Sequence, residues 1–172
     1  MDIINFLLDK GISVNLTNTD GNTPLHVSAA CGNLERTKIL VERGAEINCT
    51  NKYGHIPLMS AAHKGKSEVF LYLTKICADI NIHNNKDESA LHFAAFSGSV
   101  DIINFLLDKG MSVNLANTDG NTPLHVSAAN GNLEAMKALV ERGADLNNIN
   151  VNGSTPLMLA AYKGNVNVTL YF

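Results

Sequence analysis

The side chains of this chain that are best suited to chemistry are its histidines and cysteines. His26, His92 and His125 share one register at multiples of 33 residues, and Met59 and Met158 fill the same register elsewhere. A zinc site needs four ligands that converge on one point, whereas these histidines lie in successive segments of the chain. The spacing therefore argues against a zinc site, and we expect neither a metal site nor a cofactor.

The other reactive side chains form no recognisable catalytic set. The sequence has no Gly-rich phosphate loop, HExxH or GxSxG pattern, and a nucleophile needs a base held within hydrogen-bond reach. The cysteines are odd in number and show no CxxC spacing: Cys31, Cys49 and Cys77. Such usage is typical of free thiols in a reducing intracellular compartment such as the cytoplasm. We therefore expect a protein that is not an enzyme.

The charge of the chain does not favour nucleic acid or lipid as a partner. The net charge is −3, which gives no general attraction to anionic surfaces. Lys52, Lys64 and Lys86 form a local basic stripe, but a nucleic-acid groove requires more charge and a track of stacked aromatic side chains. No apolar run approaches the ~20 residues that a membrane helix needs. We expect no nucleic acid and no membrane span.

A period of 33 residues organises the whole chain. Leucine recurs at this spacing, at Leu25, Leu58, Leu91, Leu124 and Leu157. Glycine recurs in a second register, at Gly32, Gly65, Gly98, Gly131 and Gly164. A fixed period of this size indicates a stack of equal units rather than one globular core. Such a stack offers an elongated binding surface and not a pocket with chemistry in it.

The segment 117–149 shows how one unit is expected to fold. Thr122 can cap a helix, and Pro123 suits its first position because no amide donor is needed there. This helix is expected to run to about Asn130, and a second helix follows over about 133–142, where apolar residues recur at helical spacing. Each helix is too short to be stable alone, so stability must come from stacking.

One stretch of this unit carries a family resemblance. The residues Asn117-Thr118-Asp119-Gly120-Asn121-Thr122-Pro123-Leu124-His125 resemble the ankyrin repeat, and so do Leu139-Val140-Glu141-Arg142-Gly143-Ala144-Asp145. The resemblance covers the whole chain. It implies an all-α ankyrin-repeat solenoid of stacked helix-turn-helix units with projecting β-hairpin-like loops. We expect a single array over residues 1–172, with these repeats in order: 1–17 (partial), 18–50, 51–83, 84–116, 117–149 and 150–172 (partial).

The resemblance also implies a function. Ankyrin repeats usually bind a partner protein on a concave face built from loop tips and outward residues of the first helix of each pair. Carried over by position, the partner-binding residues are Lys52, Tyr53, His55, His63, Lys64, Lys86, Phe96, Tyr162 and Lys163. Those in the repeats 51–83 and 84–116 are basic or aromatic, which favours an acidic and apolar partner segment. The alternative is that these positions are solvated and variable.

The repeats 51–83 and 84–116 depart from the pattern of the others. Ile56 replaces the capping threonine, Cys77 and Asp87 replace glycines, and Ala90 replaces the proline. A non-glycine residue forced to positive φ costs on the order of 1 kcal/mol. We therefore predict that these two repeats are locally the weakest part of the chain.

A longer duplication overlies the short period. Residues 2–35 and 101–134 are identical except at three pairs: Ile12/Met111, Thr17/Ala116 and Cys31/Asn130. Exposed positions match as well as buried ones, which indicates a block duplication of three units. Because the second copy has Asn130 in place of Cys31, we interpret that thiol as incidental.

The chain begins and ends inside repeats, whereas natural arrays finish with polar capping repeats. We interpret it as a fragment of a longer ankyrin-repeat protein, and its uncapped ends favour end-to-end self-association. Alternatively, the repeats are the targeting or assembly region of a larger effector, toxin, channel or enzyme whose activity lies outside this chain. An engineered binder is disfavoured because a designer would have kept glycine at positions 77 and 87. The resemblance also allows asparagine hydroxylation in the loops, at Asn48, Asn81, Asn114 or Asn147.

Overall fold

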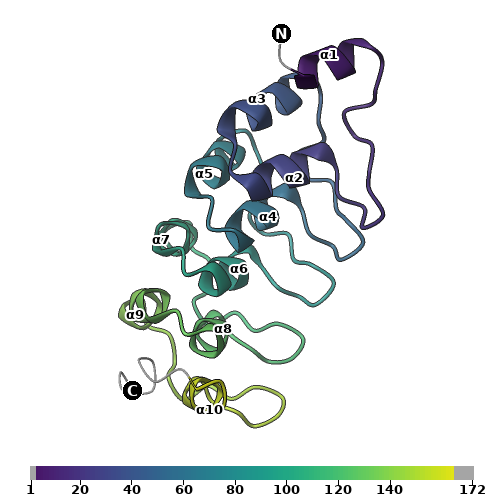
Figure 1. Cartoon of the computed structure of the whole chain (residues 1–172). Helices are drawn as coiled ribbons and strands as arrows, with labels where there is room; N and C mark the ends of the chain where they lie inside the picture. The colour runs from purple at the N-terminus through teal and green to yellow at the C-terminus, as the bar shows by residue number, and fades with distance from the viewer. Residues whose placement is uncertain (1–2, 165–172) are drawn as a thin grey trace. The chain divides into compact units, whose positions relative to one another are not determined.

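The computed structural model describes residues 3–164, which form ten α-helices joined by turns and loops (Figure 1). The chain divides into two compact units, Met1–Asn85 and Lys86–Phe172. In each unit a short helix that follows a loop tip, helix A, turns back into a second helix, helix B. The all-α repeat architecture expected from the sequence is confirmed.

The first unit contains two layers of helices. Its helices are α1 (Ile3–Asp9), α2 (Pro24–Cys31), α3 (Leu34–Glu42), α4 (Pro57–His63) and α5 (Ser67–Lys75). The A helices α2 and α4 pack side by side, and the B helices α1, α3 and α5 form the second layer, as Figure 1 shows. The loops extend from the side of the A layer.

The second unit repeats this arrangement. Its helices are α6 (Ala90–Ser97), α7 (Val100–Asp108), α8 (Pro123–Asn130), α9 (Leu133–Glu141) and α10 (Pro156–Tyr162). The A helices α6, α8 and α10 pack in that order, and α7 packs against α9 in the B layer. The bounds of α8 and α9 agree with the helices expected from Thr122, Pro123 and the apolar spacing.

Most A helices begin with a reciprocal cap formed by a hydroxyl side chain and a histidine. In α2, Thr23 Oγ1 accepts a hydrogen bond from the His26 amide, and His26 Nδ1 accepts one from the Thr23 amide at 3.2 Å. This capping box satisfies amides that the helix itself leaves unpaired. The same arrangement recurs in α6 and α8, formed by Ser89 with His92 and by Thr122 with His125. His26, His92 and His125 therefore have a structural role at the starts of their helices.

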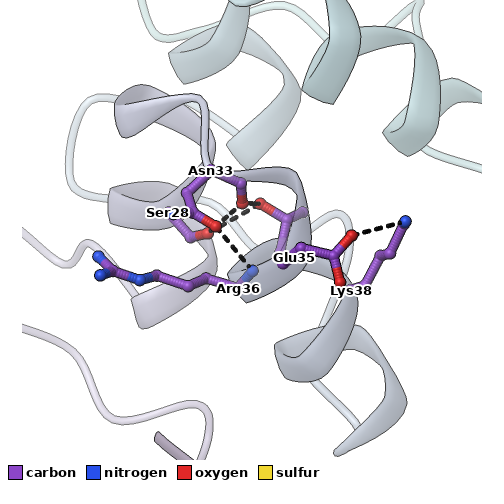
Figure 2. Close-up of polar contacts among 6 residues, drawn as sticks. Ser28, Asn33, Glu35, Arg36 and Lys38 are labelled. Carbon is purple, nitrogen blue, oxygen red and sulfur yellow. Dashed lines mark hydrogen bonds and ion pairs between the residues drawn. The ribbon is translucent and has the colours of Figure 1, made fainter. Parts of the chain in front are cut away.

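The turn from helix A to helix B is closed by side chains, as Figure 2 shows for α2 and α3. Asn33 Oδ1 accepts from the Arg36 amide at 3.0 Å and caps α3. The Thr37 hydroxyl donates to Asn33 O at 2.8 Å, and Ser28 Oγ lies 2.8 Å from Thr37 Oγ1. These bonds fix the tight turn that brings the two helices together.

Two residues in the middle of the chain carry the backbone conformation that glycine adopts elsewhere. Cys77 has φ of 71° and Asp87 has φ of 60°, where the equivalent Gly44 has φ of 85° and Gly120 has φ of 73°. Side chains with a Cβ are disfavoured at such angles. The deviations recognised in the sequence therefore correspond to strained positions in the structure.

The interior of each unit is a thin apolar seam between neighbouring helices. Four members of the leucine column are fully buried, whereas the fifth, Leu157 of α10, is 39 % exposed. Burying a leucine side chain contributes about 1.5–3 kcal/mol, so the column is a main source of stability. Alanines at the helix contacts are also fully buried and allow close approach: Ala29, Ala62, Ala94 and Ala128.

Candidate protein-binding surface

Four of the loop tips are held in shape by an asparagine. At the second tip, Asn51 Oδ1 accepts from the amides of Tyr53 and His55, at 2.9 and 3.0 Å. The backbone amide of Asn51 in turn donates to His55 O at 2.9 Å. The same bonds recur at three further tips, through Asn18, Asn117 and Asn150. These four tips are therefore ordered by local hydrogen bonds before any partner binds.

Neighbouring tips within each unit are also linked to one another. In the first unit the Lys52 amide donates to Asp20 O and the Asn85 amide donates to Tyr53 O, each at 3.0 Å. In the second unit the Thr118 and Val151 amides make the equivalent bonds, to Lys86 O and Asp119 O, also at 3.0 Å. These bonds hold the backbones of neighbouring tips together, which lowers the ordering entropy that binding would cost.

In the first unit the structure brings three of the predicted residues together at one tip. The rings of Tyr53 and His55 have centroids 6.0 Å apart, with their planes at 42°. Tyr53 is 56 % exposed, while His55 is half-buried, with Nε2 3.0 Å from Asn84 Nδ2. Lys52 is exposed beside Tyr53. Lys52, Tyr53 and His55 are called the first-unit tip patch below.

His63 and Lys64 lie at the opposite end of α4 from the first-unit tip patch. The helix begins just after the tip and ends at His63, and Lys64 occupies its C-cap. A helix of seven residues is about 10 Å long at a rise of 1.5 Å per residue. A ligand that engages both groups must therefore extend along the length of α4. Lys64 is exposed and His63 is half-buried.

The remaining predicted residues belong to the second unit. Lys86 is exposed on a loop tip, and Phe96 lies in the last turn of the helix that follows, with 42 % of its surface exposed. Tyr162 ends α10 and is 83 % exposed. Lys163 Nζ lies 5.7 Å from the centroid of the Tyr162 ring, an exposed cation–π contact that contributes about 0.5–1 kcal/mol.

Each capping histidine connects its own helix A to the next loop tip. The ring Nε2 of His26 lies 2.9 Å from His55 O, and that of His125 lies 3.0 Å from Ser154 O. Burial lowers the pKa of both His26 and His125, because a buried imidazolium loses hydration. A neutral ring protonated on Nε2 satisfies both contacts, since Nδ1 accepts from the cap amide. Both nitrogens of these rings therefore make hydrogen bonds that stabilise the fold.

The three cysteines are free thiols in different surroundings. Cys31 and Cys77 are exposed, whereas Cys49 is half-buried near Thr23. Burial raises the pKa of the Cys49 thiol, which donates to Glu46 O at 3.0 Å. A thiol with a raised pKa is a poor nucleophile at neutral pH. Cys49 therefore has the character of a structural residue.

The structure also contains an apolar groove that the sequence did not identify. It lies between α1 and α2 of the first unit and has a volume of about 430 Å³. Alkyl side chains line most of it: Ile4, Leu7, Leu8, Ile12, Leu16 and Val27. The available signal was the apolar run in α1, which matches residues 102–107 of the duplicated segment.

Residues 3–164 hold neither a cluster of metal ligands nor a helix suited to a bilayer. Among these residues, His, Cys, Asp and Glu do not gather in threes as ligands of a metal ion would. None of the helices in the same range combines the length and apolar character needed to cross a bilayer.

A family model described as "Ankyrin repeats (3 copies)" matches the chain in four overlapping segments: 1–84, 40–117, 58–150 and 91–172. Together these segments include every residue of the sequence. A comparison with curated proteins gives no match. The family comparison and the helical repeats agree on the architecture.

Proposed function

This chain belongs to the ankyrin repeat family, and we propose that it is a non-catalytic scaffold that binds a partner protein through its loop tips and the ends of its A helices. Ankyrin repeats generally mediate protein–protein interaction. The residues that we propose for this role are those predicted from the sequence: Lys52, Tyr53, His55, His63, Lys64, Lys86, Phe96, Tyr162 and Lys163.

One observation supports this proposal most strongly: large aromatic side chains stand exposed on a backbone that hydrogen bonds already hold in place. Tyr53 is 56 % exposed and Phe96 is 42 % exposed. Aromatic residues of this kind are frequent interface anchors, and a pre-ordered backbone loses little entropy on binding. We therefore assign Tyr53 and Phe96 the largest contributions.

The charge beside these anchors defines the partner that we propose. Lys52, Lys64 and Lys86 are exposed cations on the tips and helix ends. Carboxylates on a partner would pair with them and raise the association rate, while apolar side chains would cover the aromatic rings. The proposed partner is therefore an extended segment that is both acidic and apolar.

A displayed library of random peptides tests this proposal even when the natural partner has not been identified. Selection on the full chain should enrich peptides that combine Asp or Glu with large apolar residues. The double variant Y53A/F96A should bind the selected peptides at least tenfold more weakly, because each anchor is expected to contribute more than 1 kcal/mol. The control I149A, at an exposed position that is not among the proposed binding residues, should bind as the wild type does. Unchanged affinity of Y53A/F96A would refute the assignment.

In a second candidate function, the activity of the protein lies outside this chain. The repeats are then the targeting or assembly region of a larger effector, toxin, channel or enzyme, and this chain is one part of a longer ankyrin-repeat protein. The same surface still binds a protein, but its ligand is another part of that protein or its target. The sequence of the full coding region separates the two functions, because an additional domain would be visible in it directly.

We also propose that copies of this chain associate with one another. Support comes from apolar helical surface that is exposed in both units. Leu7 and Val27 are 42 % and 51 % exposed in the first unit, and Leu157 and Met158 are 39 % and 57 % exposed in the second. Light scattering over a range of concentrations tests this, and a constant monomer mass would refute it.

For the location of the protein we propose a reducing intracellular compartment, such as the cytoplasm. The support is the presence of three free thiols, two of them exposed. Localisation of the tagged chain in its source cell is the direct test. Detection only outside the cell, with the thiols oxidised, would refute the proposal.

A further inference from the structure

The duplication provides an internal comparison for the groove between α1 and α2. Because residues 2–35 and 101–134 differ at only three positions, α1–α2 and α7–α8 are two copies of nearly one sequence. The same ion pair joins the B helices in both copies. Arg43 Nη2 lies 2.8 Å from Asp9 Oδ1, and Arg142 Nη2 lies 2.6 Å from Asp108 Oδ1. Differences in exposure between the copies therefore reflect what packs beside them.

Those differences are large. Ile3 is 72 % exposed, whereas its equivalent Ile102 is 1 % exposed. Leu7 is 42 % exposed, whereas its equivalent Leu106 is fully buried. In the second unit, α6 contacts both α7 and α8 and covers this surface. The groove of the first unit is thus the place that a helix like α6 fills in the second unit.

A pair of equivalent asparagines identifies a polar feature of the same site. Asn132 Nδ2 donates to Ala95 O at 3.1 Å and to Phe96 O at 2.6 Å, at the C-terminal end of α6. In the first unit the equivalent Asn33 caps α3 with its Oδ1 instead. By this equivalence, the amide group of Asn33 is the donor that the carbonyls of a helix docked in the groove would meet.

The second unit contains a helix that exposes a matching face. In α10, Leu157 is 39 % exposed and Met158 is 57 % exposed. The equivalent residues of α4 are the same types, and Leu58 and Met59 are 0 % and 1 % exposed. In α10 this apolar face is therefore open, although the rest of the helix packs against α8.

The sequence of α10 also fits the place of α6. Leu157, Ala160 and Ala161 are identical to the equivalent Leu91, Ala94 and Ala95. Leu159 and Tyr162 are large side chains like the equivalent Phe93 and Phe96, and Met158 stands in place of His92. The paired alanines allow the close approach that α6 makes to its neighbours. A helix with the side chains of α10 can therefore occupy a site shaped for α6.

We propose that the α1–α2 groove of one copy binds α10 of a second copy, head to tail, as α6 lies beside α7 and α8. This inference rests on the proposed self-association and names its interface. Leu157 and Met158 cover the groove wall that includes Val27, and Asn33 Nδ2 donates to the carbonyls at Ala161 and Tyr162. The contact is heterologous, so each complex keeps one open groove and one open α10.

Complementation between two variants tests this interface. V27E places a charge in the groove and leaves α10 intact, whereas M158E places a charge on α10 and leaves the groove intact. Each variant alone should sediment as a monomer at concentrations where the wild type associates, with at least tenfold weaker association. An equimolar mixture should recover a dimer, because each variant supplies the surface that the other lacks. I149E, at an exposed position outside both surfaces, should associate as the wild type does.

A thiol cross-link provides a second measurement that does not depend on charge insertion. The native Cys31 lines the groove, and Lys163 follows α10 at the position equivalent to it in the repeat. Packed helices have axes about 8–10 Å apart, so a short bis-maleimide can join Cys31 to K163C of another copy. In a C49S/C77G background this reagent should give covalent dimers and higher species. Adding C31N, the residue of the duplicated segment, should abolish them.

The outcomes distinguish failure of this interface from failure of the proposed self-association and of partner binding. A wild type that stays monomeric up to about 1 mM refutes self-association and the interface together. Association of the wild type with no dimer in the V27E and M158E mixture, or with cross-links that persist in C31N, refutes the interface alone. Neither result bears on binding of a partner at the loop tips.

Discussion

Replacing Cys77 with glycine should stabilise this protein even though the change removes a side chain. Cys77 has φ of 71°, a conformation that a residue with a Cβ rarely adopts. The equivalent positions of other repeats hold glycine at φ of 85–90°: Gly11, Gly44, Gly110 and Gly143. The Cys77 side chain is exposed, so its removal loses little buried surface.

The size of the effect follows from two opposing contributions. The left-handed conformation costs a residue other than glycine about 1–2 kcal/mol. The greater freedom of glycine in the unfolded chain lowers the free energy of unfolding by about 0.4–1 kcal/mol. The net gain for C77G is therefore about 0.5–1 kcal/mol. The hydrogen bond from Asn48 Nδ2 to Cys77 O uses the backbone and is retained.

Urea unfolding measures this gain. C77G should raise the urea midpoint with little change in the m-value, and should raise Tm by about 2–4 °C for each kcal/mol in a chain of this size. The matched control C77A removes the thiol but keeps the Cβ, so its free energy of unfolding should stay within about 0.3 kcal/mol of the wild type.

The reverse substitution provides an independent check. Gly44 has φ of 85°, and a Cβ built there meets nothing within 4 Å, so G44A introduces backbone strain without a clash. The strain of about 1–2 kcal/mol is partly offset because alanine has less freedom than glycine in the unfolded chain, so G44A should lower the free energy of unfolding by about 0.5–1 kcal/mol. If C77G is no more stable than C77A, or if G44A is neutral, backbone strain at this position does not have the cost assigned to it.

Further predictions concern caps, pH and local stability. D87G should stabilise by about 0.5 kcal/mol, less than C77G because aspartate tolerates positive φ better, and urea unfolding that shows a loss would contradict this. T122A removes a helix cap and should cost about 1 kcal/mol in the same assay; no loss would contradict the role of the capping box. Because burial lowers the pKa of His26 and His125 below the unfolded value of about 6.5, the unfolded chain binds more protons below that pH. The free energy of unfolding should therefore lose nothing from these two histidines above about pH 6.5. As pH decreases toward their lower folded pKa values, it should fall by at most about 1.4 kcal/mol per pH unit for each histidine. H26M/H125M, with the residue found at Met59, should flatten this dependence, and a dependence that persists would place its origin elsewhere. Hydrogen exchange should show α4, α5, α6 and α7 less protected than α8, and the opposite order would contradict the predicted weakness of repeats 51–83 and 84–116.

Much of the local structure could be predicted because short-range chemistry determines it. Thr122 and Pro123 fix the start of α8, and the glycine column marks the ends of the A helices. The positive φ of Cys77 and Asp87 was likewise evident, because glycine occupies both registers in other repeats. The division into one array of full and partial repeats stays a prediction, as do the partner-binding residues.

The groove could not be predicted from local sequence, since it depends on what packs beside a helix. Asn33 and Asn132 lie in almost identical stretches, yet Asn33 caps its own helix and Asn132 bonds to the end of α6. The same holds for Ile3 and Ile102, which have one sequence context and opposite exposure. In each pair the difference depends on α6, a neighbouring helix that lies outside the duplicated segment.

Binding of a protein partner through the loop tips and A-helix ends can be observed residue by residue in an NMR titration of the labelled full chain with a selected acidic, apolar peptide. We expect the amide shifts to concentrate at residues 52–55, 63–64, 86 and 96, with little change along α3, α5, α7 and α9. Shifts that concentrate on those B helices, with the tip residues unchanged, would contradict the proposed binding surface.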